Sequence, residues 1–127
     1  MTQPRIGITG PCASGKSTLA RALQERGYDA RQVSQEHSYV PDLWRRFSKA
    51  DVLIFLDVTL PTIRRRLNDP TWPDFIFEAQ RERLRHAREN CHLYLDTEKM
   101  TAEGVLERVL AWLKEKEIRD WRHEIGF

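Results

Sequence analysis

The residues best suited to chemistry lie close to the N-terminus. Positions 10–17 read Gly-Pro-Cys-Ala-Ser-Gly-Lys-Ser, which fits the phosphate-binding pattern G-x-x-x-x-G-K-[ST]. In such a loop the glycines let the backbone approach phosphate oxygens, and successive amides form an anion nest. The residues expected to contact a nucleotide are Gly10, Pro11, Cys12, Ala13, Ser14, Gly15, Lys16, Ser17 and Thr18.

Two of these residues have side chains with defined tasks. The Lys16 ammonium is expected to reach the β- and γ-phosphates of a nucleoside triphosphate, and the Ser17 hydroxyl to ligate Mg²⁺. The alternative is a glycine-rich turn that contains Lys-Ser by chance. That alternative weakens because the motif falls between a predicted strand and a predicted helix.

The elements that must position this loop alternate between strands and helices. Gly27 and Thr101 mark a helix end and a helix start, and Pro61 lies in the first turn of another helix. Strands are expected at 5–9, 28–34, 52–56 and 92–95. Helices are expected at 16–26, from 59 or 60 to 68, at 74–90 and from 101 onward, with a short one after Pro41 that includes Leu43, Trp44 and Phe47.

This alternation predicts an α/β fold with parallel strands and right-handed crossovers. We expect a three-layer α/β/α sandwich around a reduced, mostly parallel sheet of about four strands. The 127 residues are the size of one domain, so residues 1–127 are taken as a single unit with 118–127 as a loose tail.

Composition narrows the function classes. Hydrophobic residues make up 40% and charged residues 31%, which is typical of a globular protein. The net charge of +2 does not favour nucleic acid or a membrane surface as a partner. Cys12 and Cys91 match no metal or redox spacing, and neither a membrane span nor a signal peptide is evident, so a cytoplasmic location is expected.

Three stretches together resemble the P-loop kinase superfamily, which includes nucleoside monophosphate, shikimate and gluconate kinases. The first is residues 6–20, which contain the glycine-rich loop. The second is Asp51-Val-Leu-Ile-Phe-Leu-Asp-Val58, followed by a helix with Arg64, Arg65 and Arg66. The third is Leu93-Tyr-Leu-Asp-Thr97 with the helix from Thr101. The resemblance implies a P-loop NTPase fold, ATP and Mg²⁺ as cofactors, and transfer of a phosphoryl group.

The resemblance also assigns residues beyond the loop. Arg66 falls where the family has an arginine on the base or phosphates, and Asp96 and Thr97 resemble the turn that touches the base. The alternative for Asp96 and Thr97 is a plain turn before the helix that Thr101 caps. Further arginines at 81, 83, 85 and 88 could close over a phosphate, although most are expected on a solvated face beside glutamates.

Two carboxylates are candidates for catalysis. Only 17 residues separate Ser34 from Val52, so the family's third strand and its acidic residue are expected to be missing. The second strand would then lie beside the first, and Glu36 would take the place of the missing acid, near Mg²⁺ or the acceptor. Asp57 ends the best strand and could order the glycine-rich loop or Mg²⁺-bound water; it could also help to start the next helix. The alternatives are a solvated loop carboxylate for Glu36 and backbone hydrogen bonding for Asp57.

Three lesser candidates stay open. His37 could contact a phosphate, although a surface histidine is the simpler interpretation. Trp72, beside a lid shortened to residues 68–73, could stack on a base or an acceptor ring. Cys12 is interpreted as filling a position where only the backbone matters.

The leading hypothesis is an ATP-dependent phosphotransferase that acts on a small-molecule acceptor, with Lys16, Glu36, Asp57 and Arg66 as catalytic residues and with Ser17 and Glu36 on the metal. The alternatives are a nucleotide-binding sensor or assembly module without transferase activity, and an NTPase that uses water. A shortened sheet edge would favour a homodimer.

Overall fold

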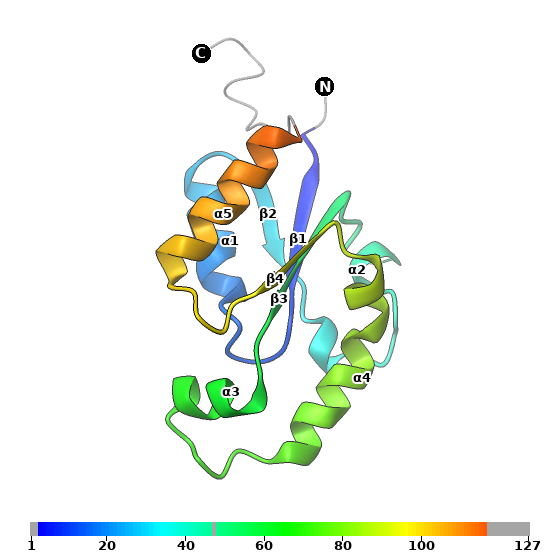
Figure 1. The fold of residues 1–127 in the computed structure, drawn as a ribbon. Coiled ribbons are helices and arrows are strands. Elements are labelled where there is room, and N and C mark those ends of the chain that lie inside the picture. Colours follow the sequence, from blue (N-terminus) through cyan, green and yellow to red (C-terminus); the bar gives the residue numbers. More distant parts are fainter. Residues whose placement is uncertain (1–2, 47, 117–127) are drawn as a thin grey trace.

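The computed structural model describes residues 3–46 and 48–116, which form an α/β unit around a four-stranded sheet (Figure 1). The strands are β1 (Arg5–Thr9), β2 (Asp29–Gln32), β3 (Val52–Asp57) and β4 (Leu93–Asp96). They lie in the order β2-β1-β3-β4, and all three pairings are parallel. The expected mostly parallel sheet of about four strands is therefore confirmed.

The helices fall close to the predicted places. They are α1 (Lys16–Glu25), the 3₁₀ turn η1 (Gln35–His37), α2 (Leu43–Arg46), α3 (Leu60–Leu67), α4 (Asp74–Asn90) and α5 (Ala102–Glu115). Thr101 caps α5 as expected, because its hydroxyl accepts a hydrogen bond from the Gly104 amide at 3.0 Å. The helix after Pro41 is only four residues long, and Phe47 lies outside the described residues.

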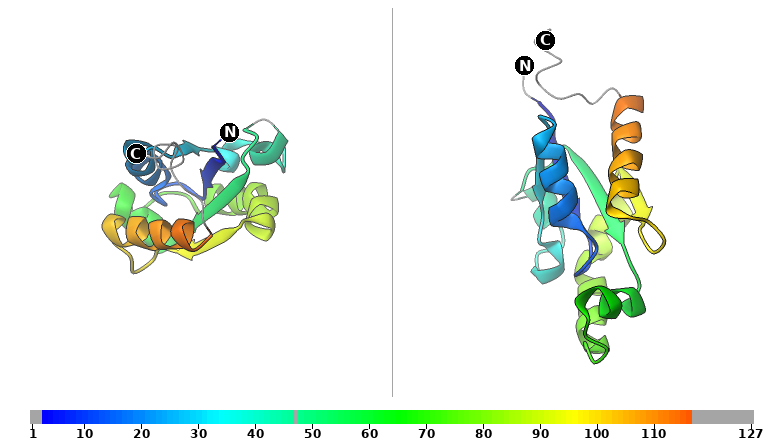
Figure 2. Two further views of the ribbon diagram at one scale, coloured as in Figure 1. Left: turned by 90° about the horizontal axis from the view of Figure 1, so that it is seen from above. Right: turned by 90° about the vertical axis from the view of Figure 1, so that its left-hand side faces the viewer.

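Helices cover both faces of the sheet. On one face α1 and α5 bury Leu19, Leu23, Val109 and their neighbours against β1, β3 and β4. On the other face α2 and α4 bury Trp44, Leu84 and others against β3. Figure 2 shows this layering from two sides, with α3 beyond the end of the sheet. The continuous apolar run of β3 fits this double coverage, since five of its residues are buried.

The topology places the ends of the strands where a ligand can be held. From β1 the chain passes to β2 on one side and then returns to β3 on the other side of β1. This reversal is compatible with a Rossmann-like layout, in which ligands bind beyond the carboxyl ends of the strands on either side of the switch point. In this chain the segment beyond β1 at that point is the glycine-rich loop.

The sequence-based expectations differ from the structure in small ways. β2 spans four residues instead of seven, although the Val33 amide still donates to the Ile8 carbonyl at 2.8 Å.

No helix within the described ranges is both long and apolar enough to cross a bilayer. The expected loose tail at 118–127 lies outside the described residues.

Candidate functional site

The glycine-rich loop makes a tight turn between β1 and α1. Gly10 has a φ of 153°, Ala13 of 60° and Gly15 of 96°. Gly15 is the residue before α1, and Leu19 donates the first i→i−4 hydrogen bond of the helix, to the Gly15 carbonyl at 3.1 Å. The amides at the start of the helix therefore lack i−4 partners, and no acidic side chain lies in the first turn. Such a helix start favours an anion.

The first glycine of the loop is required by space as well as by φ. A Cβ at Gly10 would lie 2.0 Å from the Leu56 carbonyl oxygen, a backbone atom of β3. A Cβ at Gly15 would meet no heavy atom within 4 Å. β3 therefore leaves no room for a side chain at Gly10. A side chain at Gly15 has room, and only the φ of that residue is unfavourable.

We therefore expect Gly10→Ala to destabilise the protein more than Gly15→Ala. The first variant combines overpacking, which costs about 1–3 kcal/mol or more, with an unfavourable φ. The second meets only the cost of a left-handed conformation, about 1–2 kcal/mol. Urea unfolding of both variants measures the difference, and equal losses would contradict the close approach of loop and β3.

The central polar contact of the site is a buried ion pair. Lys16 Nζ lies 2.7 Å from Glu36 Oε2, and the two side chains are 5% and 4% exposed. The same ammonium donates to the carbonyl oxygens of Gly10 and Pro11, both at 2.9 Å. The fold thus brings the predicted loop lysine and the predicted carboxylate together, because β2 lies directly beside β1.

Glu36 is not a solvated loop carboxylate. It lies in η1, immediately after β2, and its Oε1 is buried with no hydrogen-bond partner within the described ranges. A buried acceptor without a partner is costly, on the order of 1–3 kcal/mol. The arrangement therefore leaves one carboxylate oxygen available to a ligand, a water or an ion.

A groove of about 520 Å³ runs along the loop and is lined by residues that the sequence predicts to bind phosphate. Ser17 and Thr18 are exposed there, whereas Lys16 and Glu36 form its polar floor. Ser17 and Glu36, the two residues predicted to serve Mg²⁺, thus line one groove. Oxygen ligands of this kind suit Mg²⁺, which keeps several waters and takes few ligands from the protein.

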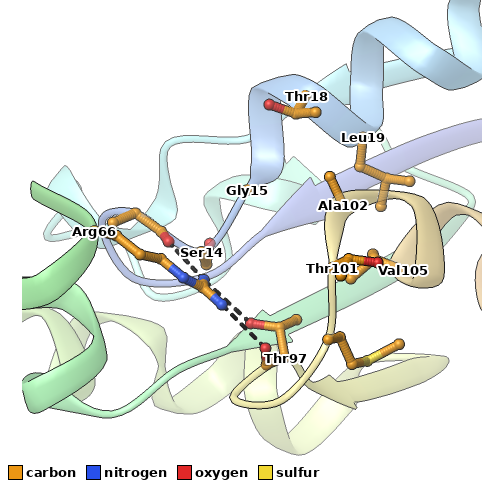
Figure 3. Close-up of a pocket in the computed structure, with 11 residues that line it drawn as sticks. Ser14, Gly15, Thr18, Leu19, Arg66, Thr97, Thr101, Ala102 and Val105 are labelled. Atoms are coloured by element: carbon orange, nitrogen blue, oxygen red, sulfur yellow. Dashed lines mark hydrogen bonds between the residues drawn. The ribbon is translucent and has the colours of Figure 1, made fainter.

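A second hollow of about 210 Å³ continues from the groove between α1 and α5 (Figure 3). Its walls come from the loop and α1, from Arg66, and from the segment between β4 and α5. Its apolar side is formed by Leu19, Met100, Ala102 and Val105. A flat base attached to phosphates in the groove would have room there.

Arg66 connects the two sides of this hollow. Its guanidinium donates to the Ala13 carbonyl at 2.9 Å and to the Thr97 carbonyl at 3.0 Å, with a longer contact to Thr97 Oγ1 (Figure 3). Arg64 instead donates to the Trp72 carbonyl, and Arg65 to the Thr62 hydroxyl. Among the described contacts of the three consecutive arginines, those of Arg66 reach the loop. Its expected contact with a base or with phosphates stays a prediction.

Asp57 and Asp96 face a different cavity. This cavity has a volume of about 220 Å³ and is reached by the loop only through Pro11. Asp57 accepts hydrogen bonds from the Val58 amide at 3.0 Å and the Tyr94 hydroxyl at 2.6 Å. Across residues 3–46 and 48–116, Asp57 makes no hydrogen bond or ion pair with the loop. The structure therefore shows the backbone hydrogen bond that was the alternative for Asp57, together with a bond from a tyrosine. The expected role of Asp57 at Mg²⁺-bound water stays a prediction.

The same cavity receives two of the α4 arginines. Arg81 lies over the Phe77 ring, and Arg88 lies over Tyr94 with Nη2 3.9 Å from Asp57 Oδ2. Partial burial and the hydrogen bond to Asp57 raise the pKa of Tyr94 to about 12, so its hydroxyl stays protonated. Arg85 instead forms an exposed pair with Glu82, as expected for a solvated face.

Two other candidates are Trp72, which lies away from the loop groove, and His37, which lies beside Glu36. Trp72 packs beside Val58, Ile63 and Phe77 and lines neither the groove nor the base-sized hollow. The structure therefore gives no support to stacking of Trp72 on a base. The His37 side chain is 60% exposed, and its Nε2 lies 3.8 Å from Glu36 Oε2.

Sequence analysis missed Gln80, which fixes the loop from α4. Its Oε1 accepts the Cys12 amide at 3.1 Å and its Nε2 donates to Cys12 Sγ at 3.0 Å. Gln80 is 1% exposed. A signal was present, because Gln80 is a single polar residue on the face of α4 that buries Phe77, Leu84 and Ala87.

Glu98 was missed as well, and it positions the helix that carries Arg66. Its carboxylate accepts hydrogen bonds from the amide and hydroxyl of Thr59 and from the hydroxyl of Thr62, at the N-terminus of α3. Thr59 itself provides no side-chain cap. Glu98 therefore caps α3 from the loop after β4. The hydrogen bonds from Thr59 and Thr62 lower the pKa of Glu98 to about 2.

A pH dependence follows from this cap. The lowered pKa means that the Glu98 carboxylate stabilises the fold above its ordinary pKa near 4.5 and loses this effect as the pH falls toward 2. We expect Glu98→Gln to lower stability at pH 7 by about 1 kcal/mol, as for other helix caps. The difference should shrink in melting curves recorded from pH 5 down to pH 3, and a constant difference would contradict the cap.

Comparison with known proteins adds no relative to this picture. No protein-family model matches the chain, and a search of curated proteins finds no significant match. The interpretation of the site therefore depends on its own residues: a glycine-rich turn, a buried Lys16–Glu36 pair and the hollow that Arg66 borders.

Proposed function

We propose that this chain is a P-loop protein that binds the Mg²⁺ complex of ATP. The observation that carries the proposal is the Lys16 ammonium, buried beside the start of α1 and held at 2.7 Å from a carboxylate that a phosphate could replace. The triphosphate would lie along residues 10–18, with Ser17 and Glu36 toward Mg²⁺. The base would lie in the hollow between α1 and α5, beside Arg66 and Thr97.

We propose further that the protein is a kinase that transfers the γ-phosphate to a small acceptor. Lys16 and Mg²⁺ would neutralise the charge on the transferring group, so that catalysis depends on positioning and electrostatics. Glu36 would accept the proton of the acceptor hydroxyl or order a Mg²⁺-bound water.

A second candidate is a nucleotide-binding module without transferase activity. The observation that favours it is the closed packing of the segment after β2. Gln35 is fully buried and donates to the Val40 carbonyl at 2.7 Å, and Arg83 donates to the Glu36 carbonyl at 3.3 Å. These contacts bring the segment onto α4, where an open acceptor-binding region would otherwise be expected.

One experiment separates these functions. The purified protein is incubated with Mg²⁺-ATP and a pool of anionic and neutral metabolites, and products are identified by mass spectrometry. A phosphorylated metabolite supports the kinase. Thermal stabilisation by ATP without any product supports the module, and ADP release without an acceptor supports an NTPase. Absence of stabilisation and of every product would contradict nucleotide binding itself.

A further inference from the structure

Three side chains of different chemistry meet at the mouth of the glycine-rich loop. Cys12 Sγ, a carboxylate oxygen of Glu36 and a ring nitrogen of His37 all lie within 4.8 Å of one another. Cys12 is half-buried, Glu36 is buried and His37 is exposed. We propose that these three residues bind one soft divalent cation, of which Zn²⁺ is the representative, in the nucleotide-free protein.

The donor types select the class of ion. Thiolate and imidazole favour Zn²⁺ and related transition metals, whereas Mg²⁺ favours carboxylate, carbonyl and water oxygens. Ligand atoms on one tetrahedral Zn²⁺ lie about 3.3–3.8 Å apart, given metal–ligand bonds of about 2.0–2.3 Å. The site must therefore contract by no more than about 1.5 Å, and the exposed His37 side chain has the freedom to move. Three protein ligands leave the fourth position open to water.

The Glu36 carboxylate supplies an independent reason to expect a ligand. Its Oε2 is bound to Lys16, but its Oε1 is buried and has no hydrogen-bond partner among the described residues. The Glu36 oxygen near His37 is Oε2, at 3.8 Å. A cation held by both oxygens of this carboxylate would also satisfy Oε1 and remove the cost of an unsatisfied buried acceptor. In the metal-bound form the Cys12 thiolate and the Glu36 carboxylate would contribute two negative charges against the one positive charge of Lys16, which balances a divalent cation better than Lys16 alone opposes it.

Gln80 of α4 fixes the position of the Cys12 sulfur. The Gln80 Nε2 donates to Cys12 Sγ at 3.0 Å, and the Gln80 Oε1 accepts the Cys12 amide at 3.1 Å. A metal ion binds the thiolate form of cysteine, so binding at Cys12 would release the thiol proton. Gln80 is thus an outer-shell partner of the kind that orients metal ligands.

This proposal does not rest on the proposed nucleotide function, because the cation is bound by the protein without nucleotide. The two can fail separately. Zinc binding without any effect of ATP would leave only the metal site, and ATP binding without zinc binding would leave only the nucleotide site.

The test is a Zn²⁺ titration of the full chain against a chromophoric chelator, with a large excess of Mg²⁺ present. We expect one equivalent of Zn²⁺ in the wild type. Affinity should fall at least about tenfold in Cys12→Ser and in His37→Ala, the lower end of the loss seen even for outer-shell partners. The matched control is Cys91→Ser, which removes the other cysteine of the chain and should bind zinc as the wild type does.

Alkylation by iodoacetamide, read peptide by peptide, gives a second measurement. Zn²⁺ should protect Cys12 and leave the reaction of Cys91 unchanged; Cys91 reacts slowly because burial raises the pKa of its thiol. His37→Ala alters an exposed side chain and keeps the test decisive if Cys12→Ser does not fold. The proposal is overturned by wild-type zinc affinity in His37→Ala, by absence of stoichiometric binding, or by equal protection of both cysteines.

Discussion

Replacing Lys16 by methionine is expected to abolish the thermal stabilisation that Mg²⁺-ATP gives the wild-type protein. At a free ligand concentration about 100 times Kd, binding stabilises a protein by about 2.7 kcal/mol. Methionine keeps the length of the side chain and removes the ammonium that would meet the β- and γ-phosphates. Melting curves with and without Mg²⁺-ATP measure the effect, and undiminished stabilisation in the variant would contradict the assignment.

The buried pair requires a matched control for this variant. Lys16→Met leaves Glu36 buried without its cation, and breaking a buried pair costs about 3–5 kcal/mol. The double variant Lys16→Met/Glu36→Gln removes both charges and should regain much of that loss. If the double variant folds like the wild type and still does not respond to ATP, loss of binding is separated from loss of folding.

Glu36→Gln is expected to have the opposite effect on nucleotide binding and a large effect on turnover. The Glu36 carboxylate lies 2.7 Å from the Lys16 ammonium, so it competes with phosphate for that charge. Glutamine removes the competing charge and keeps an amide oxygen that can serve Mg²⁺ or its bound water, so the affinity for Mg²⁺-ATP should be retained or increased. Removing the proton acceptor should lower product formation by about 10²–10⁴-fold.

Two measurements on the same sample check this separation. Isothermal titration gives the affinity for ATP, and product analysis gives the rate. Asp57→Asn is the comparison variant, because Asp57 bonds Val58 and Tyr94 and does not contact the loop. Parallel loss of affinity and rate in Glu36→Gln would show that Glu36 supports the loop structurally, and an unchanged rate would remove it from the chemistry.

The parts of the fold that the sequence predicted are those encoded locally. The apolar run 52–56 indicated a strand covered on both faces, and Thr101 indicated the start of the last helix. The sequence predicted that Glu36 lies near the glycine-rich loop, because a missing strand brings β2 beside β1. It did not predict the direct contact of Glu36 with Lys16. The depth of burial of the pair depends on the packing of η1 and α4, for which no local pattern exists.

The long-range contacts of the site could not be predicted. Glu98 caps α3 through Thr59, the residue before that helix and 39 residues earlier in the chain, and Gln80 fixes an amide 68 residues away. The sequence left Asp57 as a candidate either for the metal site or for backbone hydrogen bonding. In the structure its carboxylate accepts a hydrogen bond from Tyr94 on the neighbouring strand. The spacing of residues along the chain does not show whether a carboxylate at the end of a strand lies toward the loop or toward the cavity beside α4.

A crystal structure of the protein with Mg²⁺ and a non-hydrolysable ATP analogue tests the central claim most directly. The account predicts phosphate oxygens against the amides of residues 13–18, Lys16 moved from Glu36 onto the β- and γ-phosphates, and the base beside Arg66. An analogue bound elsewhere while the loop retains its Lys16–Glu36 contact would contradict the account.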